Sequence, residues 1–216
     1  MADQGQAPGF FGKVPAHGDF VCRRVPPLVR DCFDHWLQAS IVHSKRELGA
    51  AWLAVWSNSP LWRFVVGAGV CGEQAWTGVM MPSADRVGRC FPLLLLAPCN
   101  GDLMAMADLL PHAHWFLRLE EIALSALEVD SSLEKLDCAL TTLGGSPPAL
   151  PAFRGAGDSA WWCAESPLMA PHCAIHRGLP SPAAFMALID GTRRAQAPAV
   201  HVTPDINGGP DGLSGN

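Results

Sequence analysis

Ionisable and hydroxyl side chains gather in two short turns of this sequence. They are Lys13, His17 and Asp19 in the first turn, and Ser83, Asp85, Arg86 and Arg89 in the second. Histidine and carboxylate side chains can move protons, and arginine can hold an anion. If the protein is an enzyme, these residues point to a small hydrolase with a site around His17, Asp19 and Arg86.

Two other interpretations of the turns compete with catalysis. In the first, Asp19 or Asp85 accepts hydrogen bonds from loop amides and an arginine pairs with the carboxylate, so the charges serve the turn itself. In the second, both turns lie at one end of a sheet and form a charged recognition surface for a partner. The sequence leaves both interpretations open.

Other candidate motifs lack a part that their chemistry needs. Gly12-Lys13 is not a phosphate-binding loop, because Val14 stands where a Ser or Thr would be needed. Gly67-Ala-Gly69 lacks the third glycine and the helix of a dinucleotide site. The histidines at 112, 114, 172 and 176 have no partner cluster at metal-ligand spacing. We therefore predict no metal, no cofactor and no enzymatic activity.

Composition limits the class of protein. The 216 residues are 49% hydrophobic and carry a net charge of −5, so no general attraction to nucleic acid is expected. We expect no membrane insertion, because no apolar run approaches the length of a spanning helix. Residues 1–9 lack the basic and apolar regions of a signal peptide, which favours a cytoplasmic location. The eight scattered cysteines are then expected to stay reduced, without a disulfide.

The turns must be positioned by an α+β fold. Apolar runs predict strands at 10–15, 61–66, 75–81 and 91–97, and the last three follow each other closely enough to be antiparallel. Helical spacing predicts helices at 28–48, at 52–56, from 103 to an interruption at Pro111, at 115–126 and at 182–189. Ser131-Ser-Leu-Glu134 has the pattern of a capping box for a further helix that ends at residue 143. Two further strands are expected at 161–164 and 172–175. The expected architecture is a largely antiparallel sheet flanked by helices, with an element order that also fits a profilin- or longin-like arrangement.

The same pattern predicts one domain over residues 1–194. From residue 195 to 216 the chain is rich in Pro and Gly and has little to bury, which favours a disordered tail.

Several segments in order resemble the TagF (ImpM) family of type VI secretion-associated proteins. These segments are Gly9-Phe-Phe-Gly-Lys-Val-Pro-Ala-His-Gly-Asp-Phe-Val21, Trp36-Leu37, Leu61-Trp-Arg-Phe64, and Gly78 to Arg89 with Phe91-Pro92. The resemblance is strongest over residues 9–97. Cys90 departs from the family, which often has an aromatic residue at this place.

The resemblance implies a cytoplasmic accessory protein that restrains assembly of the secretion system after translation. It also implies a partner, the forkhead-associated-domain protein of the same system. Some relatives are fused to a phosphatase domain, but this chain lacks the aspartate clusters of such a domain. No catalytic residues are carried over.

Overall fold

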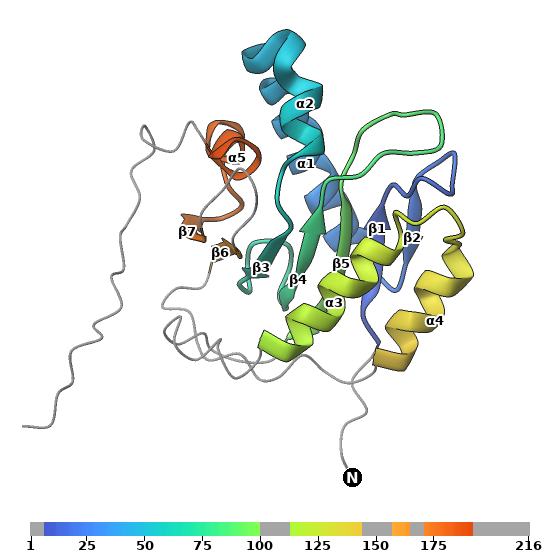
Figure 1. The fold of residues 1–216 in the computed structure, drawn as a ribbon. Helices are drawn as coiled ribbons and strands as arrows, with labels where there is room; N and C mark the ends of the chain where they lie inside the picture. Colours follow the sequence, from blue (N-terminus) through green and yellow to red (C-terminus); the bar gives the residue numbers. More distant parts are fainter. Residues whose placement is uncertain (1–6, 100–112, 144–156, 165–170, 192–216) are drawn as a thin grey trace, which may run out of the picture.

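The fold is known from a computed structural model that describes residues 7–99, 113–143, 157–164 and 171–191 (Figure 1). Its centre is a seven-stranded antiparallel sheet with the order β2-β1-β5-β4-β3-β6-β7. The strands are β1 (Gly9–Gly12), β2 (Val21–Arg23), β3 (Trp62–Val66), β4 (Ala75–Met81), β5 (Leu93–Cys99), β6 (Asp158–Cys163) and β7 (His172–Arg177). The predicted α+β class is confirmed.

Helices cover both faces of this sheet (Figure 1). They are α1 (Pro27–Leu48), α2 (Trp52–Ser57), α3 (Ala113–Ser125), α4 (Leu133–Leu143) and α5 (Pro182–Ile189), with a 3₁₀ turn at Gly49–Ala51 between α1 and α2. Side chains of α1, α2 and α5 form one core with the sheet, and side chains of α3 and α4 form a second core on the opposite face. The molecule therefore has three layers.

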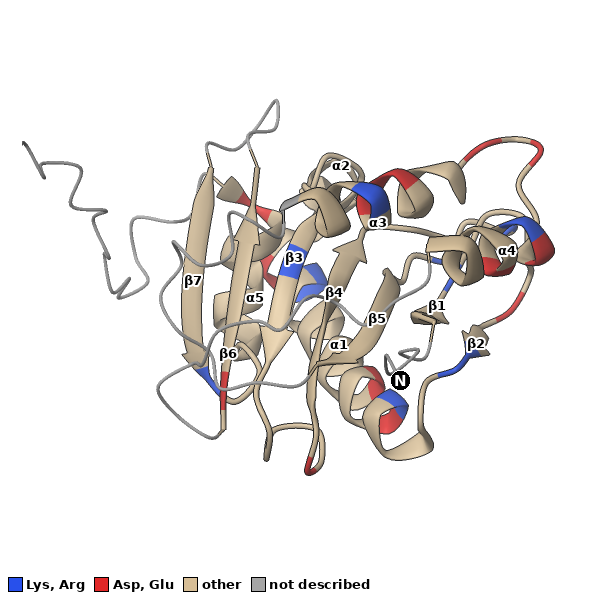
Figure 2. Ribbon diagram, turned by 90° about the horizontal axis from the view of Figure 1, so that it is seen from below, with Lys and Arg blue, Asp and Glu red and all other residues tan. Residues whose placement is uncertain are grey.

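Strand β5 lies inside both cores because its side chains alternate between them. Leu94 and Leu96 belong to the core under α1, whereas Leu93 and Leu95 belong to the core under α3 and α4. This is the environment that a continuous apolar run predicts. Figure 2 shows the same property as colour: β4 and β5 carry no charged residue, and charges lie mainly on helices, loops and outer strands.

Strand β2 was not predicted, because three residues give too short a pattern to separate a strand from a loop. Val21–Arg23 pairs with β1 at the edge of the sheet. The carboxylate of Asp137 in α4 pairs with both Arg23 and Arg24, which follow each other at the end of this strand. The ion pairs connect the edge strand to the helical layer.

The helices agree with the periodicity of the sequence. In α1 the buried side chains include Phe33, Trp36, Leu37 and Ile41, which helical spacing places on one face. Helix α4 begins at Leu133, one residue later than a cap at Ser131 predicts. The capping residue is Ser132, whose hydroxyl accepts a hydrogen bond from the Lys135 N–H at 3.2 Å.

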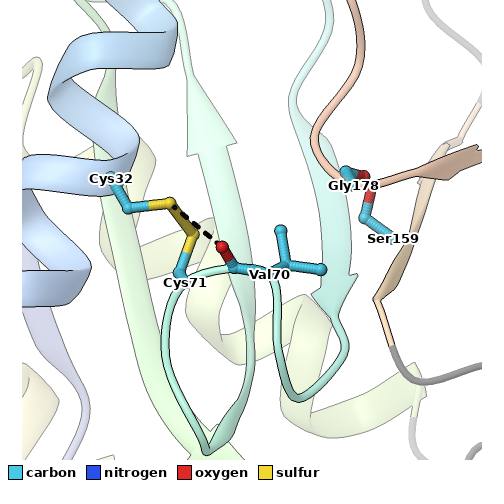
Figure 3. The surroundings of a disulfide bond; sticks show 5 residues. All are labelled: Cys32, Val70, Cys71, Ser159 and Gly178. Carbon is cyan, nitrogen blue, oxygen red and sulfur yellow. Dashed lines mark hydrogen bonds between the residues drawn. A yellow bond between two sulfur atoms is a disulfide. The ribbon is translucent and has the colours of Figure 1, made fainter.

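The prediction that all cysteines are reduced is wrong. Cys32 in α1 and Cys71 in the loop between β3 and β4 form a disulfide with a Cα–Cα distance of 5.6 Å (Figure 3). Compartment and spacing guided the prediction, but the two residues are 39 positions apart. Only the fold, which lays α1 beside this loop, brings them together.

Some predicted elements lie outside the described residues, namely the helix from residue 103 to its interruption at Pro111 and the tail from residue 195. Within the described ranges, no helix is both long and apolar enough to span a bilayer.

Candidate functional site

The register of three neighbouring strands brings the two predicted turns to one end of the sheet. Leu93 at the start of β5 is opposite Gly12 at the end of β1 and opposite Met81 at the end of β4. The chain therefore leaves β1 and β4 at the same end of the sheet. We call residues 13–20 the first loop and residues 82–92 the second loop.

Glycine is needed where the first loop begins. Gly12 has a φ of 135°, and a Cβ placed on it would lie 2.0 Å from the carbonyl oxygen of Pro92. With no side chain at this position, the backbone passes close to the second loop, and the Lys13 N–H donates to the Pro92 carbonyl at 3.4 Å. Lys13 is thereby directed toward Asp85.

The Asp85 carboxylate is the centre of the site. Its Oδ2 lies 3.0 Å from Lys13 Nζ and 2.6 Å from Arg89 Nε. Its Oδ1 accepts hydrogen bonds from the N–H groups of Val87 at 3.1 Å and Arg89 at 2.9 Å. Because the Asp85 carboxylate interacts with four donor groups from two loops, it holds both loops in one conformation. We call Lys13, Asp85 and Arg89 the charged clasp.

Burial and hydrogen bonding act on Asp85 in opposite directions. Burial by itself raises its pKa, but the Arg89 N–H, the Lys13 ammonium, the Arg89 guanidinium and the Val87 N–H stabilise the charged form. Their sum is larger, and the pKa of Asp85 lies well below its ordinary value. The carboxylate is therefore ionised at neutral pH although its side chain has no solvent exposure.

Further hydrogen bonds join the loops along their backbones. The Arg89 guanidinium donates to the Gly18 carbonyl at 2.7 Å, and the Arg86 N–H donates to the His17 carbonyl at 3.0 Å. On the side of the helical layer, the indole N–H of Trp56 in α2 donates to the Ser83 carbonyl at 3.2 Å. The second loop is thus fixed to the first loop and to the helical layer.

Aromatic rings cover the charged clasp. Phe20 stacks on Phe11 at 6.1 Å between ring centroids and meets Phe91 edge-on at 4.8 Å. Lys13 Nζ lies 4.9 Å from the centre of the Phe20 ring, within reach of a cation–π interaction. These rings limit the access of water to the ion pair.

The seven residues singled out in the sequence divide into two groups. Lys13, Ser83 and Asp85 are buried, whereas His17, Asp19, Arg86 and Arg89 are exposed. Asp19 Oδ1 accepts a hydrogen bond from the adjacent Phe20 N–H at 3.1 Å. Among the interactions of the described residues, none joins the side chains of His17, Asp19 and Arg86 to one another.

Two exposed apolar residues were missed by the sequence analysis. Phe20 and Val87 are 45% and 69% exposed and lie in the same loops as the charges. The signal was a large apolar residue within a polar turn, beside Asp19 in one case and Arg86 in the other. Together with the four exposed polar residues they form what we call the loop surface: His17, Asp19, Phe20, Arg86, Val87 and Arg89.

The described part of the chain contains no group of three His, Cys, Asp or Glu side chains that could hold a metal ion. A hollow of about 690 Å³ lies elsewhere, between α3 and α4, and its lining includes His114, Trp115, Arg118 and Cys138. It involves none of the seven predicted residues.

Comparison with known proteins agrees with this arrangement. No curated protein is similar enough to count as a match. The crystal structure of PA0076 from Pseudomonas aeruginosa PAO1 is similar over 93% of this chain and 100% of its own, with 31% identity and a TM-score of 0.80. The family description "TagF N-terminal domain, Type VI secretion system-associated" matches residues 9–143, which include both loops and the charged clasp. This chain belongs to the TagF family of type VI secretion-associated proteins.

Proposed function

We propose that the protein is a non-enzymatic, cytoplasmic accessory factor that restrains type VI secretion assembly after translation. Its target in this proposal is the forkhead-associated-domain component of the secretion system. The observation that carries the proposal is the loop surface, a set of exposed residues held rigid by the buried pair of Lys13 and Asp85.

The composition of the loop surface suits protein recognition. Arginine and aromatic residues are enriched among the side chains that dominate binding energy at protein interfaces. Here Phe20 and Val87 offer apolar area, and Arg86 and Arg89, which lie on either side of Val87 in the sequence, offer positive charge. Asp19 is the one acidic residue of the loop surface, and its carboxylate already accepts a loop hydrogen bond. A partner surface that offers both acidic and apolar groups fits this composition.

Rigidity adds to this argument. A loop that is already ordered loses less conformational entropy on binding than a mobile one. The charged clasp and the aromatic cover reduce that loss for both loops, and the Trp56 hydrogen bond reduces it for the second loop.

The test is a binding titration with the purified forkhead-associated-domain protein. Arg86→Ala and Val87→Glu are expected to weaken binding at least tenfold while leaving the melting temperature within about 2 °C of wild type, because both side chains are exposed. Val42→Glu in α1 is a matched control, since Val42 is also 69% exposed but lies outside both loops. It should bind as the wild type does.

Secretion assays separate the target from the surface. A strain that lacks the protein should secrete more, and wild-type protein should restore restraint whereas Val87→Glu should not. Unchanged binding by Arg86→Ala and Val87→Glu would rule out the loop surface. Restraint lost without any loss of binding would point to a different target.

A further inference from the structure

The disulfide between Cys32 and Cys71 is the first of a series of contacts that join α1, the β3–β4 loop and the β6–β7 pair. Cys71 lies in the loop of residues 67–74 between β3 and β4. This loop is hydrogen-bonded to the β6–β7 pair, since the Gly67 N–H donates to the Asp158 carbonyl at 2.8 Å and the Gly157 N–H donates to the Ala68 carbonyl at 2.9 Å. The disulfide adds α1 to this series (Figure 3).

The series continues into β7. The Gly178 N–H donates to the Gly157 carbonyl, and the Ser159 hydroxyl donates to the Gly178 carbonyl, both at 2.6 Å. Strands β6 and β7 lie outside the residues that match the TagF N-terminal domain. The loop of residues 67–74 therefore lies between the matched domain's first helix and the strands that follow the match.

The site also suits the reduced state. Cys32 Sγ lies 3.7 Å from the Val70 carbonyl oxygen, the contact drawn as a dashed line in Figure 3. A disulfide sulfur carries no hydrogen, so this contact becomes a hydrogen bond only when Cys32 is a thiol. Cys71 is 2% exposed within the core under α1, where a free thiol packs like a small apolar side chain. After reduction, the Cys32 thiol therefore has a hydrogen-bond acceptor and the Cys71 thiol has apolar packing.

Access is asymmetric, which suits reversible exchange. Cys71 is buried, whereas Cys32 is only partly buried at the surface of α1. An external reagent therefore reaches Cys32 first, and Cys71 is placed to complete the exchange from inside.

From these observations we infer that Cys32 and Cys71 form a thiol–disulfide switch that fastens α1 to the β3–β4 loop. The oxidant is a low-molecular-weight disulfide of the glutathione class. The Cys32 thiolate attacks one sulfur of this reagent and releases the first small thiol. The Cys71 thiolate then attacks Cys32 Sγ and releases the second. Two protons and two electrons leave the protein, and the electrons reduce the reagent to two thiols.

The test equilibrates the full chain in oxidised or reduced glutathione, blocks remaining thiols and digests the protein with trypsin. Cys32 is the one cysteine in the tryptic peptide 31–45, and Cys71 is the one cysteine in the peptide 64–86. The two peptides should be joined after oxidation and separate after reduction under native conditions. Because the bond closes a long loop, oxidation should raise the melting temperature by about 5–10 °C.

Hydrogen exchange provides a local readout. Reduction should increase exchange at Gly69 and Val70 and leave the centre of β5 unchanged. Cys71→Ala should remove the glutathione dependence of the melting temperature, whereas Cys22→Ser/Cys138→Ser, which changes two exposed thiols, should retain it. Two results would overturn the switch: alkylation of Cys32 and Cys71 in the oxidising buffer, or a linkage that resists reduction until the chain is unfolded.

Discussion

Lys13 and Asp85 form a buried ion pair between two loops that are far apart in the sequence, with Nζ 3.0 Å from Oδ2 and side-chain exposures of 7% and 0%. Lys13 belongs to the loop after β1 and Asp85 to the loop between β4 and β5. Lys13 and Asp85, two of the charges that the sequence offers as a functional site, therefore hold the scaffold, whereas His17, Asp19 and Arg86 are exposed.

The ion pair predicts a stability effect for Asp85→Asn. The substitution keeps the shape of the side chain but leaves the Lys13 ammonium buried without its counter-ion, which is strongly destabilising. We expect the melting temperature at pH 7 to fall by about 5–10 °C in a thermal scan followed by circular dichroism. Asp19→Asn, in the exposed part of the first loop, is the control and should melt within about 2 °C of wild type. Equal melting of Asp85→Asn and wild type would show that the clasp does not stabilise the fold.

Asp85 also predicts how stability depends on pH. Its folded-state pKa is lower than the ordinary value of 3.8, so the folded protein holds the proton less tightly than the unfolded chain does. Its contribution is therefore present above about pH 4 and is lost as the pH falls from there toward the folded-state pKa. Urea unfolding of wild type and Asp85→Asn from pH 7 to pH 2.5 should show a gap in stability that narrows below about pH 4. A gap that stays constant over this range would contradict the assignment.

The elements around the clasp were accessible to sequence reasoning because their signals are local. The apolar run at 91–97 and the run at 75–81 predict β5 and β4, and Pro82 and Gly88 predict the turn between them. What could not be predicted depends on pairing across the fold. Which cation approaches Asp85 follows from the β1–β5 register, and nothing local to Lys13 encodes it.

The same distinction explains the disulfide and the edge strand. Cys32 and Cys71 meet because α1 lies over the β3–β4 loop, a tertiary relation that cysteine spacing does not contain. Strand β2 is specified mainly by its partner β1 rather than by its three residues. In contrast, the sequence alone predicts that the side chains of Glu120 and Glu121 point in different directions, because adjacent residues on a helix do not face each other.

The structure gives this pair of glutamates different partners and hence a matched test. Glu120 accepts two hydrogen bonds from the Arg63 guanidinium in β3, at 2.7 and 2.8 Å, with side-chain exposures of 12% for Arg63 and 16% for Glu120. Glu121 pairs with Arg118 at the exposed surface of the same helix. Glu120→Gln should lower the free energy of unfolding by about 2–4 kcal/mol, because a mostly buried guanidinium loses its counter-ion.

Glu121→Gln is the control, and its effect should stay below about 0.5 kcal/mol because exposed ion pairs contribute little. Both values come from urea unfolding at pH 7. Equal effects at the two positions would mean that the Arg63–Glu120 pair does not anchor α3 to the sheet.

Trp62 gives the last prediction, which concerns the attachment of α5. Its indole N–H donates to the Leu188 carbonyl at 2.8 Å, and the side chain is 1% exposed. Trp62→Phe removes this donor and part of the packing beneath α5, so the free energy of unfolding should fall by about 2–4 kcal/mol. Amide hydrogen exchange in α5 should increase more than in α3, because the lost bond ends on α5 itself.

Trp115→Phe is the matched control for this substitution. The indole nitrogen of Trp115 is buried but has no hydrogen-bond partner within the described residues. Removing a buried donor that is already unpaired relieves a desolvation cost, which offsets part of the lost packing. Trp115→Phe should therefore change stability by less than about 1 kcal/mol and leave exchange in α5 unaltered. If both substitutions loosen α5 to the same extent, loss of ring volume rather than the Trp62 hydrogen bond controls its attachment.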